Sequence, residues 1–428
     1  MWNIRDFAQR ICPKIQDSVP LIVAFLLPVP QKLVSFAVRA SELPSLKCKC
    51  YAQRFSVGRS IALILISSLH KINRFMKPMN IRTPLLCLCL LAGSLFALPC
   101  FSQCFSGSYT AEWQWNTNKK INWLNLLRLD LNLPIKSGTD YLEAATLHMA
   151  KAKEGIGTDW QAFSNIEADN NVAALAVLGY RHACENANVF LGVRNVNEDF
   201  FTSDATSLFV NSSCGIFPTI AASYPIANYP FSGLTVYFDV SRNGWTFRNS
   251  LYNGVGYNGW RRHDNPFLVR PKEDGVFNIS QLEYSHRDGH YFAGVAVHSR
   301  QFAVDEEGEL LTESPAAETS CAWWAYGEQP LWKTEEKSIS VMAQYSENTC
   351  HSNACRRYGE VGCVYQDSRN ACGLSGQYAL FQQGREYSVE MTWRRQLTRS
   401  LDVQPCCQYV TNGDGDFFVV CARLCYDF

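Results

Sequence analysis

The end of the chain alternates between apolar and more polar side chains. The apolar set, with members two residues apart, is Phe418, Val420, Ala422, Leu424, Tyr426 and Phe428. The residues between them become charged toward the end, at Arg423 and Asp427. Alternation over about ten residues is typical of one tilted strand that crosses a bilayer, with lipid on one face and water on the other. The pattern predicts a membrane strand, although an edge strand of a soluble sandwich would show the same alternation.

Three turn sequences allow the pairing of strands to be predicted. Two-residue loops are expected at Asn243-Gly244, Asp288-Gly289 and Asn412-Gly413. Such a loop fixes which residues face each other across a hairpin. The predicted opposite pairs include Val240 with Phe247, Tyr284 with Ala293, and Cys407 with Phe418. In all three hairpins the apolar residues of both strands then share one face, which favours long antiparallel hairpins with one apolar and one polar side.

The charge of the chain changes sharply along its length. Residues 1–78 carry twelve Lys or Arg and three acidic residues, whereas residues 104–428 carry 26 bases and 36 acids. An apolar run at 84–98 follows two basic residues and precedes small residues, a pattern that predicts a secretory signal peptide over 76–103. Cleavage is expected between Ala97 and Gln103. Residues 1–75 then form a basic leader, either disordered or a mis-assigned start upstream of Met76 or Met79.

The remaining residues, 104–428, predict a membrane protein built of strands. They contain no run of 18 apolar residues, so no transmembrane helix is expected. The alternating stretches of about nine to eleven residues are longer than typical soluble strands. About 325 residues suffice for a closed barrel of about 12–18 strands, and closure leaves no free sheet edge in lipid. We expect a closed antiparallel transmembrane β-barrel around a water-filled pore, with Tyr141–Lys153 as the clearest helical candidate.

One region resembles a known family. The segment 189–233, VFLGVRNVNEDFFTSDATSLFVNSSCGIFPTIAASYPIANYPFSG, together with 247–260 and 400–428, is similar to the carbohydrate-selective porin (OprB) family. The resemblance spans about residues 105–428 and implies a barrel of about 16 strands in the outer membrane of a Gram-negative bacterium, which allows passive diffusion of carbohydrates. It implies carbohydrate solutes and outer-membrane lipid as partners, no nucleic acid and no cofactor, with monomer and trimer both open. The chain departs from the family in its extra N-terminal residues and its twelve cysteines from Cys104 onward.

The same segment is informative without the family. A predicted strand ends at Arg194, a polar turn follows, and about 35 residues with three prolines come next. The prolines at Pro218, Pro225 and Pro230 disfavour continuous strand pairing. We expect this stretch to fold into the lumen and narrow the pore, with a surface loop as the alternative.

A pore for sugars needs hydrogen-bonding groups and charges on its walls. The candidates for pore lining and sugar binding are Arg194, Asn197, Glu198, Asp199, Arg248, Glu283 and Arg300. Three tryptophans, Trp123, Trp245 and Trp393, lie in the lipid-facing registers and are expected in the girdles at the membrane interfaces.

The cysteines and histidines do not predict a metal or catalytic site. Cys350, Cys355, Cys363 and Cys372 lack the paired spacing of structural zinc sites, so no metal is expected and a loop disulfide such as Cys350–Cys355 is favoured. Cys407, Cys421 and Cys425 are expected to be free residues of the wall. No catalytic residue is assigned, because the chain has no nucleophile elbow and no phosphate loop.

Two other functions stay open at this point. A secreted soluble β-sandwich that binds carbohydrate would bury the apolar faces of the same hairpins. A barrel-embedded hydrolase would assemble its site from distant strands, which sequence spacing does not reveal.

Overall fold

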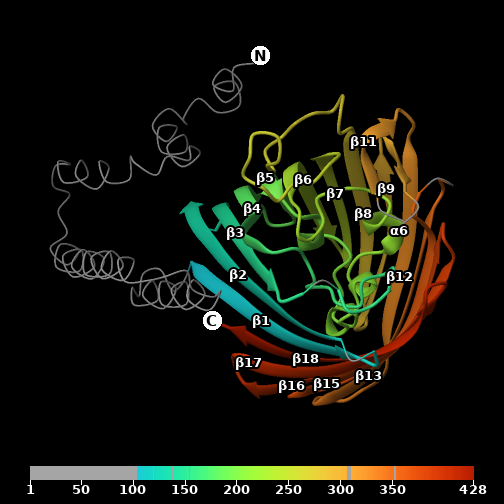
Figure 1. The fold of residues 1–428 in the computed structure, drawn as a ribbon. Coiled ribbons are helices and arrows are strands. Elements are labelled where there is room, and N and C mark those ends of the chain that lie inside the picture. The colour runs from blue at the N-terminus through green and yellow to red at the C-terminus, as the bar shows by residue number, and fades with distance from the viewer. Residues whose placement is uncertain (1–103, 119, 137, 154, 306–309, 351–352) are drawn as a thin grey trace, which may run out of the picture. The chain divides into compact units, whose positions relative to one another are not determined.

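The computed structural model describes residues 104–428 except positions 119, 137, 154, 306–309 and 351–352. The predicted leader, 1–75, and signal peptide, 76–103, lie outside the described residues. Within the described part, sixteen antiparallel strands close into one ring, and two further strands form a separate pair (Figure 1). The predicted closed antiparallel barrel of about 16 strands is confirmed, and the two-layer sandwich is wrong. None of the described helices is both long and apolar enough to cross a membrane.

The strands follow the ring in sequence order, except that the separate pair β10 and β11 interrupts it between β9 and β12. The barrel strands are β1 (Phe105–Asn116), β2 (Ile121–Lys136), β3 (Asp140–Lys151), β4 (Asn171–Ala183), β5 (Ala187–Arg194), β6 (Gly233–Arg242), β7 (Trp245–Asn253), β8 (Val276–His286), β9 (Gly289–His298), β12 (Ser320–Lys333), β13 (Lys337–Asn348), β14 (Cys355–Asp367), β15 (Asn370–Phe381), β16 (Arg385–Thr398), β17 (Leu401–Asn412) and β18 (Gly415–Asp427). The remaining elements are β10 (Gln301–Val304), β11 (Leu310–Ala316), η2 (Val196–Glu198), η3 (Thr206–Leu208), η4 (Ser212–Cys214) and α6 (Pro218–Ala221).

The first and last strands pair and close the ring. Ala111 of β1 faces Leu424 of β18, and the backbone groups of Gly107 and Phe428 exchange two hydrogen bonds of 3.0 Å. Every connection at the rim where both these strand ends lie is two or three residues long, and we call it the short-turn rim. The opposite, long-loop rim carries the connections 152–170, 254–275 and 299–319.

The first predicted hairpin register is confirmed. Val240 faces Phe247, and the loop residues Asn243 and Gly244 both have positive φ, at 53° and 82°. Two successive positive φ values are the requirement of the tight turn that matches strand twist.

The other two predicted registers are wrong by two residues. The loop of the second hairpin is Arg287-Asp288, with φ of 47° and 66°, so Tyr284 faces Tyr291. In the third hairpin Asn412 pairs with Gly415, so Cys407 faces Val420. Because side chains alternate with a period of two, an even shift leaves each residue on its predicted face.

The alternation of the last strand separates the outside of the barrel from its inside. Phe418, Leu424 and Tyr426 are 37%, 41% and 45% exposed, whereas Val419 and Arg423 between them are 1% and 8% exposed. The three predicted girdle tryptophans, Trp123, Trp245 and Trp393, also lie on the exposed outer face. The lipid-facing set is therefore apolar, as an outer-membrane strand requires.

The predicted helix over Tyr141–Lys153 is wrong. All of these residues but the last two belong to β3, which pairs with β2 and β4 on its two sides. Ala145, Leu147 and Met149 are buried and two residues apart, a strand period that pairing on both sides enforces over local helix propensity.

The residues 195–232, which we call the long inner segment, lie inside the barrel (green in Figure 1). Glu390 of β16 accepts hydrogen bonds from the backbone N–H groups of Val210 and Asn211, at 2.7 and 2.9 Å. Thr219 bonds Ser346 of β13 at 2.7 Å. The predicted placement in the lumen is therefore confirmed for this segment, and the surface-loop alternative is wrong.

A second, unexpected stretch also enters the barrel. This short inner segment, 152–170, contributes Ile156 and Phe163 to a cluster with inward residues of β17 and β18. Glu386 of β16 accepts the backbone N–H groups of Trp160 and Gln161 at 2.7 and 3.0 Å. Both inner segments are thus fixed to the inward face of β16 by glutamates.

The cysteine predictions are corrected by the strand register. Cys406 of β17 and Cys421 of β18 face each other at a Cα–Cα distance of 5.1 Å and form a disulfide. This distance is ordinary for disulfides, and Cys421 is therefore not a free residue of the wall. Cys355 is a free, buried thiol, so the predicted Cys350–Cys355 bridge is not formed.

Candidate functional site

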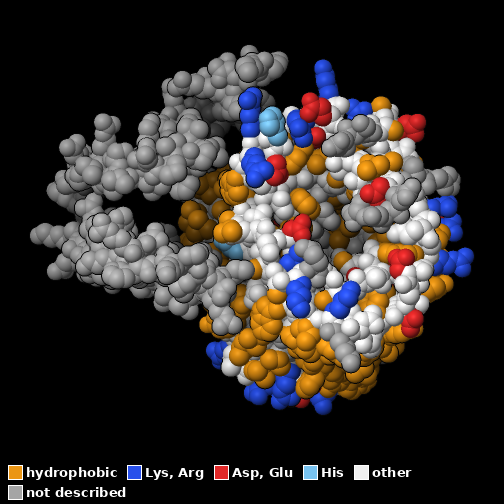
Figure 2. Space-filling view, in the orientation of Figure 1, with side chains coloured by type: hydrophobic (Ala, Val, Ile, Leu, Met, Phe, Trp, Pro, Cys, Tyr) orange, Lys and Arg blue, Asp and Glu red, His pale blue; other side chains and the backbone are white. Residues whose placement is uncertain are grey.

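Charged side chains line the inside of the barrel on β2–β8. Figure 2 shows acidic and basic side chains inside the ring, and apolar side chains gathered over the lower part of its outer surface. We call this set, with the first residues of the long inner segment, the charged wall. Its members are Arg128, Asp130, Glu143, Arg181, Arg194, Glu198, Asp199, Arg248 and Glu283.

Arg194 occupies the centre of the charged wall. It is the last residue of β5, which has 8 residues beside the 13 of β4, so the chain leaves the wall partway along the barrel. The Arg194 guanidinium donates to Glu143 at 3.0 Å and to Asp199 at 2.7 Å. Arg181 forms an ion pair with the same Glu143 at 2.7 Å. Acidic and basic groups therefore alternate from β4 to the long inner segment.

Arg248 extends this chain of contacts toward β8. Its guanidinium donates to the Glu283 carboxylate at 2.9 Å and to the backbone oxygen of Asp199 at 3.1 Å. His290 of β9 lies 3.8 Å from the Glu283 carboxylate. One arginine thus ties the long inner segment to the wall while its carboxylate partner reaches a third strand.

Arg128 binds Glu198, the residue before Asp199 in the long inner segment. It donates to both carboxylate oxygens of Glu198, at 2.6 and 3.0 Å, and also to Asp130. Glu198 ends η2, whose N-cap residue Asn195 accepts the backbone N–H of Asn197 at 2.8 Å. The cap and the two-pronged arginine contact hold Glu198 at a defined position.

The structure brings most of the predicted site residues together. Arg194, Glu198, Asp199, Arg248 and Glu283 all belong to the charged wall. Asn197 supports it, because its side-chain oxygen accepts the backbone N–H of Tyr229 at 3.1 Å and ties the two ends of the long inner segment.

Arg300 lies elsewhere. The strand β9 ends at His298, two residues before it, and the Arg300 side chain donates to the backbone oxygen of Lys272 at 2.5 Å in the β7–β8 connection. The sequence prediction extended the alternation of the strand past its end.

Four members of the charged wall were not among the predicted residues. Arg128 and Asp130 lie on the polar side of a stretch whose alternation was recognised, so their inward position was available from the sequence. Glu143 fell in the predicted helix, which concealed its strand face. Arg181 had no turn signal to set its register.

Burial divides the charged wall into partly exposed members and buried members. The side chains of Arg128, Arg181 and Arg248 are 24–32% exposed, whereas those of Arg194 and Asp199 are 12% and 6% exposed. Burial raises the pKa of Asp199 to about 6, although the adjacent Arg194 opposes that rise. Asp199 is therefore ionised at neutral pH and gains a proton in mild acid.

The charged wall offers both signs of charge at close range. Four arginines and five carboxylates supply hydrogen-bond donors and acceptors. The guanidinium of Arg194 also lies 4.7 Å from the ring centre of Phe190. No group of three or more metal-ligating side chains is found within the described residues.

Known proteins resemble this chain in sequence and in fold. The sequence profile of the "Carbohydrate-selective porin, OprB family" matches residues 106–417. The high-pH structure of OprB from Pseudomonas putida superposes with a TM-score of 0.60 at 14% identity, over 76% of this chain and 94% of that chain. Its low-pH structure gives a TM-score of 0.50 at 14% identity, over 76% and 92%. No curated protein matches the sequence. At such identities the structural likeness establishes the fold alone.

Proposed function

Because this chain belongs to the carbohydrate-selective porin (OprB) family, we propose that it is an outer-membrane porin through which carbohydrates diffuse passively. The observation that carries this proposal is the charged wall, in which partly exposed arginines alternate with carboxylates inside a closed ring. We infer that this wall borders the narrowest part of the solute path.

Mixed charge suits a neutral, hydroxyl-rich solute. A sugar hydroxyl donates to a carboxylate and accepts from a guanidinium. Each hydrogen bond that the sugar loses to water is therefore replaced by one to the wall. Arg128, Arg181 and Arg248 are the exposed donors, and Glu198 is an acceptor beside them. An apolar solute cannot replace the hydrogen bonds that these groups make with water. Passage also requires that binding stay weak, and the partial exposure of these side chains to water favours weak binding.

The inner segments provide the narrowing. The long inner segment is bonded to β16 through Glu390 and to the charged wall through Asp199 and Glu198. Because it is held on two sides of the ring, its position is fixed, and we infer that the solute path passes between it and the charged wall. The segment thereby restricts the size of solutes that pass.

The two rims suggest an orientation. Barrels of bacterial outer membranes place short turns at the periplasmic side and longer loops outside. We therefore place the short-turn rim, with both strand ends of the closing pair, in the periplasm. A solute enters at the long-loop rim, passes the charged wall and leaves at the short-turn rim.

Conductance and swelling measurements test this function. Protein purified from the membrane fraction is expected to give stepwise conductance in planar bilayers, lowered when glucose or maltotriose is added. Liposomes that contain it are expected to swell in isotonic glucose faster than empty liposomes. An R248Q variant should swell more slowly in glucose, whereas R399Q, at an exposed turn residue between β16 and β17, should match wild type. Conductance without any effect of sugar on current or swelling would refute the carbohydrate assignment.

A further inference from the structure

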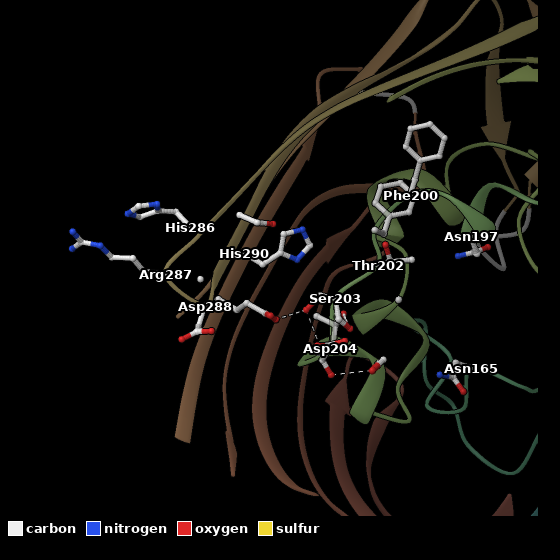
Figure 3. Close-up of a pocket in the computed structure, with 17 residues that line it drawn as sticks. Asn165, Asn197, Phe200, Thr202, Ser203, Asp204, His286, Arg287, Asp288 and His290 are labelled. Atoms are coloured by element: carbon white, nitrogen blue, oxygen red, sulfur yellow. Dashed lines mark hydrogen bonds between the residues drawn. The ribbon is translucent and has the colours of Figure 1, made fainter. Parts of the chain in front are cut away.

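A cavity of about 840 Å³ lies beyond the charged wall, where the β8–β9 turn faces the long inner segment. Its size falls within the range of small-molecule sites, about 300–1,000 Å³. Figure 3 shows that the His290 ring points toward the long inner segment, whereas the side chains of His286 and Arg287 point away from that segment. The cavity therefore has a polar inner side formed by His290, by Glu328 of β12 and by residues 202–207.

Glu328 is held so that one carboxylate oxygen remains available. Its Oε2 accepts from the Tyr326 hydroxyl at 2.6 Å, from the Ser203 hydroxyl and from the backbone N–H of Ala205. No bond to its Oε1 is found within the described residues. The anchored oxygen fixes the side chain and leaves the other free to accept a hydrogen bond from a ligand.

Asp204, which also lines the cavity, supplies a second acceptor. Its side chain is exposed and its carboxylate makes no hydrogen bond or ion pair with the described part of the chain. Its backbone oxygen accepts the Ser207 hydroxyl at 2.9 Å, which stabilises the turn that carries it.

The backbone before these residues is strained and well packed. Phe201 has a φ of 64°, which is rare for a bulky residue. Its ring centre lies 5.4 Å from that of Phe217 and 5.1 Å from that of Trp324. The packing holds the strained conformation, and strain of this kind is concentrated at ligand sites. It also directs residues 202–204 at the cavity.

We propose that the cavity is a second carbohydrate-binding station, which binds one pyranose ring after it leaves the charged wall. Adjacent sugar hydroxyls donate to the carboxylates of Asp204 and Glu328, and His290 completes the polar side. Two carboxylates without an ion-pair partner among the described residues repel phosphate and other anions, so the ligand is a polyol rather than an anion. The station rests on the proposed function, since it takes its solute from the same path.

Equilibrium binding tests the station separately from transport. The full-length protein in detergent is titrated with methyl α-glucoside, and binding is followed by saturation-transfer difference NMR. D204A is expected to weaken the affinity about tenfold, the loss typical of one hydrogen bond to a charged group. E336Q, which changes an exposed acid in the β12–β13 turn of the same rim, should retain wild-type affinity. Since Asp204 is exposed on a turn, its truncation leaves the packed residues in place, and an unchanged circular dichroism spectrum verifies this.

Three outcomes overturn the station. Equal affinity of D204A and wild type removes Asp204 from any sugar site. Equal weakening by D204A and E336Q shows a general effect of rim charge. Binding that depends on added calcium rather than on sugar concentration makes the carboxylates a cation site. In each case swelling of wild-type liposomes in glucose would still support the proposed function, and only its absence would remove that function as well.

Discussion

Glutamates on two sides of the ring serve different partners. On β16, Glu386 and Glu390 are fully buried and accept backbone N–H groups of the two inner segments. On β3 and β8, Glu143 and Glu283 bind guanidinium groups of the charged wall. A carboxylate that binds backbone amides fixes the path of a chain, whereas one that binds arginine leaves charged groups at the lumen. The comparison indicates that Glu386 and Glu390 hold the inner segments through backbone groups, whereas Glu143 and Glu283 hold the arginines of the charged wall.

The largest effect on stability is expected from E390A, on the strand that holds the inner segments. The change leaves the N–H groups of Val210 and Asn211 buried without an acceptor, which costs about 1–3 kcal/mol for each. Guanidinium unfolding of the detergent-folded protein should show a loss of about 2–6 kcal/mol, and single-channel conductance should rise as the long inner segment loosens. E336A is the control, because Glu336 is exposed in a turn. Unchanged conductance together with lowered stability would show that this anchor does not set the pore width.

A smaller effect on stability but a clear one on selectivity is expected from R194Q. The substitution removes one positive charge between Glu143 and Asp199. One unit charge at about 4 Å is worth about 1 kcal/mol in water, so the cation-to-anion permeability ratio should rise about fivefold. The reversal potential in a KCl gradient measures this ratio, with R399Q as the matched control. If both variants shift the potential equally, the charged wall does not select ions.

A smaller change in ion selectivity, in the opposite direction, is expected from lowering the pH. Burial raises the pKa of Asp199 to about 6, so this carboxylate is ionised at pH 7.5 and mostly protonated at pH 5. Acidification removes a negative charge beside Arg194 and Arg248, and cation preference should therefore fall between pH 7 and pH 5. D199N should already show the low cation preference at pH 7.5, and its preference should not fall between pH 7 and pH 5. A step of equal size in D199N would assign the titration to another group.

The smallest effect is expected from R300Q. The Arg300 side chain donates to the backbone oxygen of Lys272 in the β7–β8 connection. This contact lies outside the charged wall and does not involve the glutamates of β16. Glucose swelling and the reversal potential should remain those of wild type. A reduction like that of R248Q would place Arg300 on the solute path and redraw the boundary of the charged wall.

The faces of the strands could be predicted from the sequence better than their registers. Alternation alone placed Phe418 and Leu424 outside, because a period of two survives any even error. The turn at Arg287-Asp288 was missed because the Asp288-Gly289 pair is the stronger sequence signal for positive φ, yet the chain adopts positive φ one residue earlier. Local turn chemistry therefore did not determine the loop.

The contents of the lumen were predicted only where side chains carried a signal. Three prolines marked the long inner segment as non-strand. The short inner segment is held by the backbone N–H groups of Trp160 and Gln161. Because every residue but proline has such a group, no residue type in the sequence predicts this contact. The Cys406–Cys421 bridge likewise depends on a register that the sequence prediction had shifted by two.

The pairing of β1 with β18 has a consequence for how the protein is made. The two strands that complete the ring lie at opposite ends of the described chain, and Thr110 contacts a residue 315 positions away. Contacts of such separation form slowly, because the whole intervening polypeptide must first be ordered. Until the last strand is in place, the other fifteen strands would leave two sheet edges with unpaired backbone N–H and C=O groups, which lipid cannot satisfy. Closure of the ring thus depends on the last strand, and a chain that lacked β18 would form an incomplete cylinder.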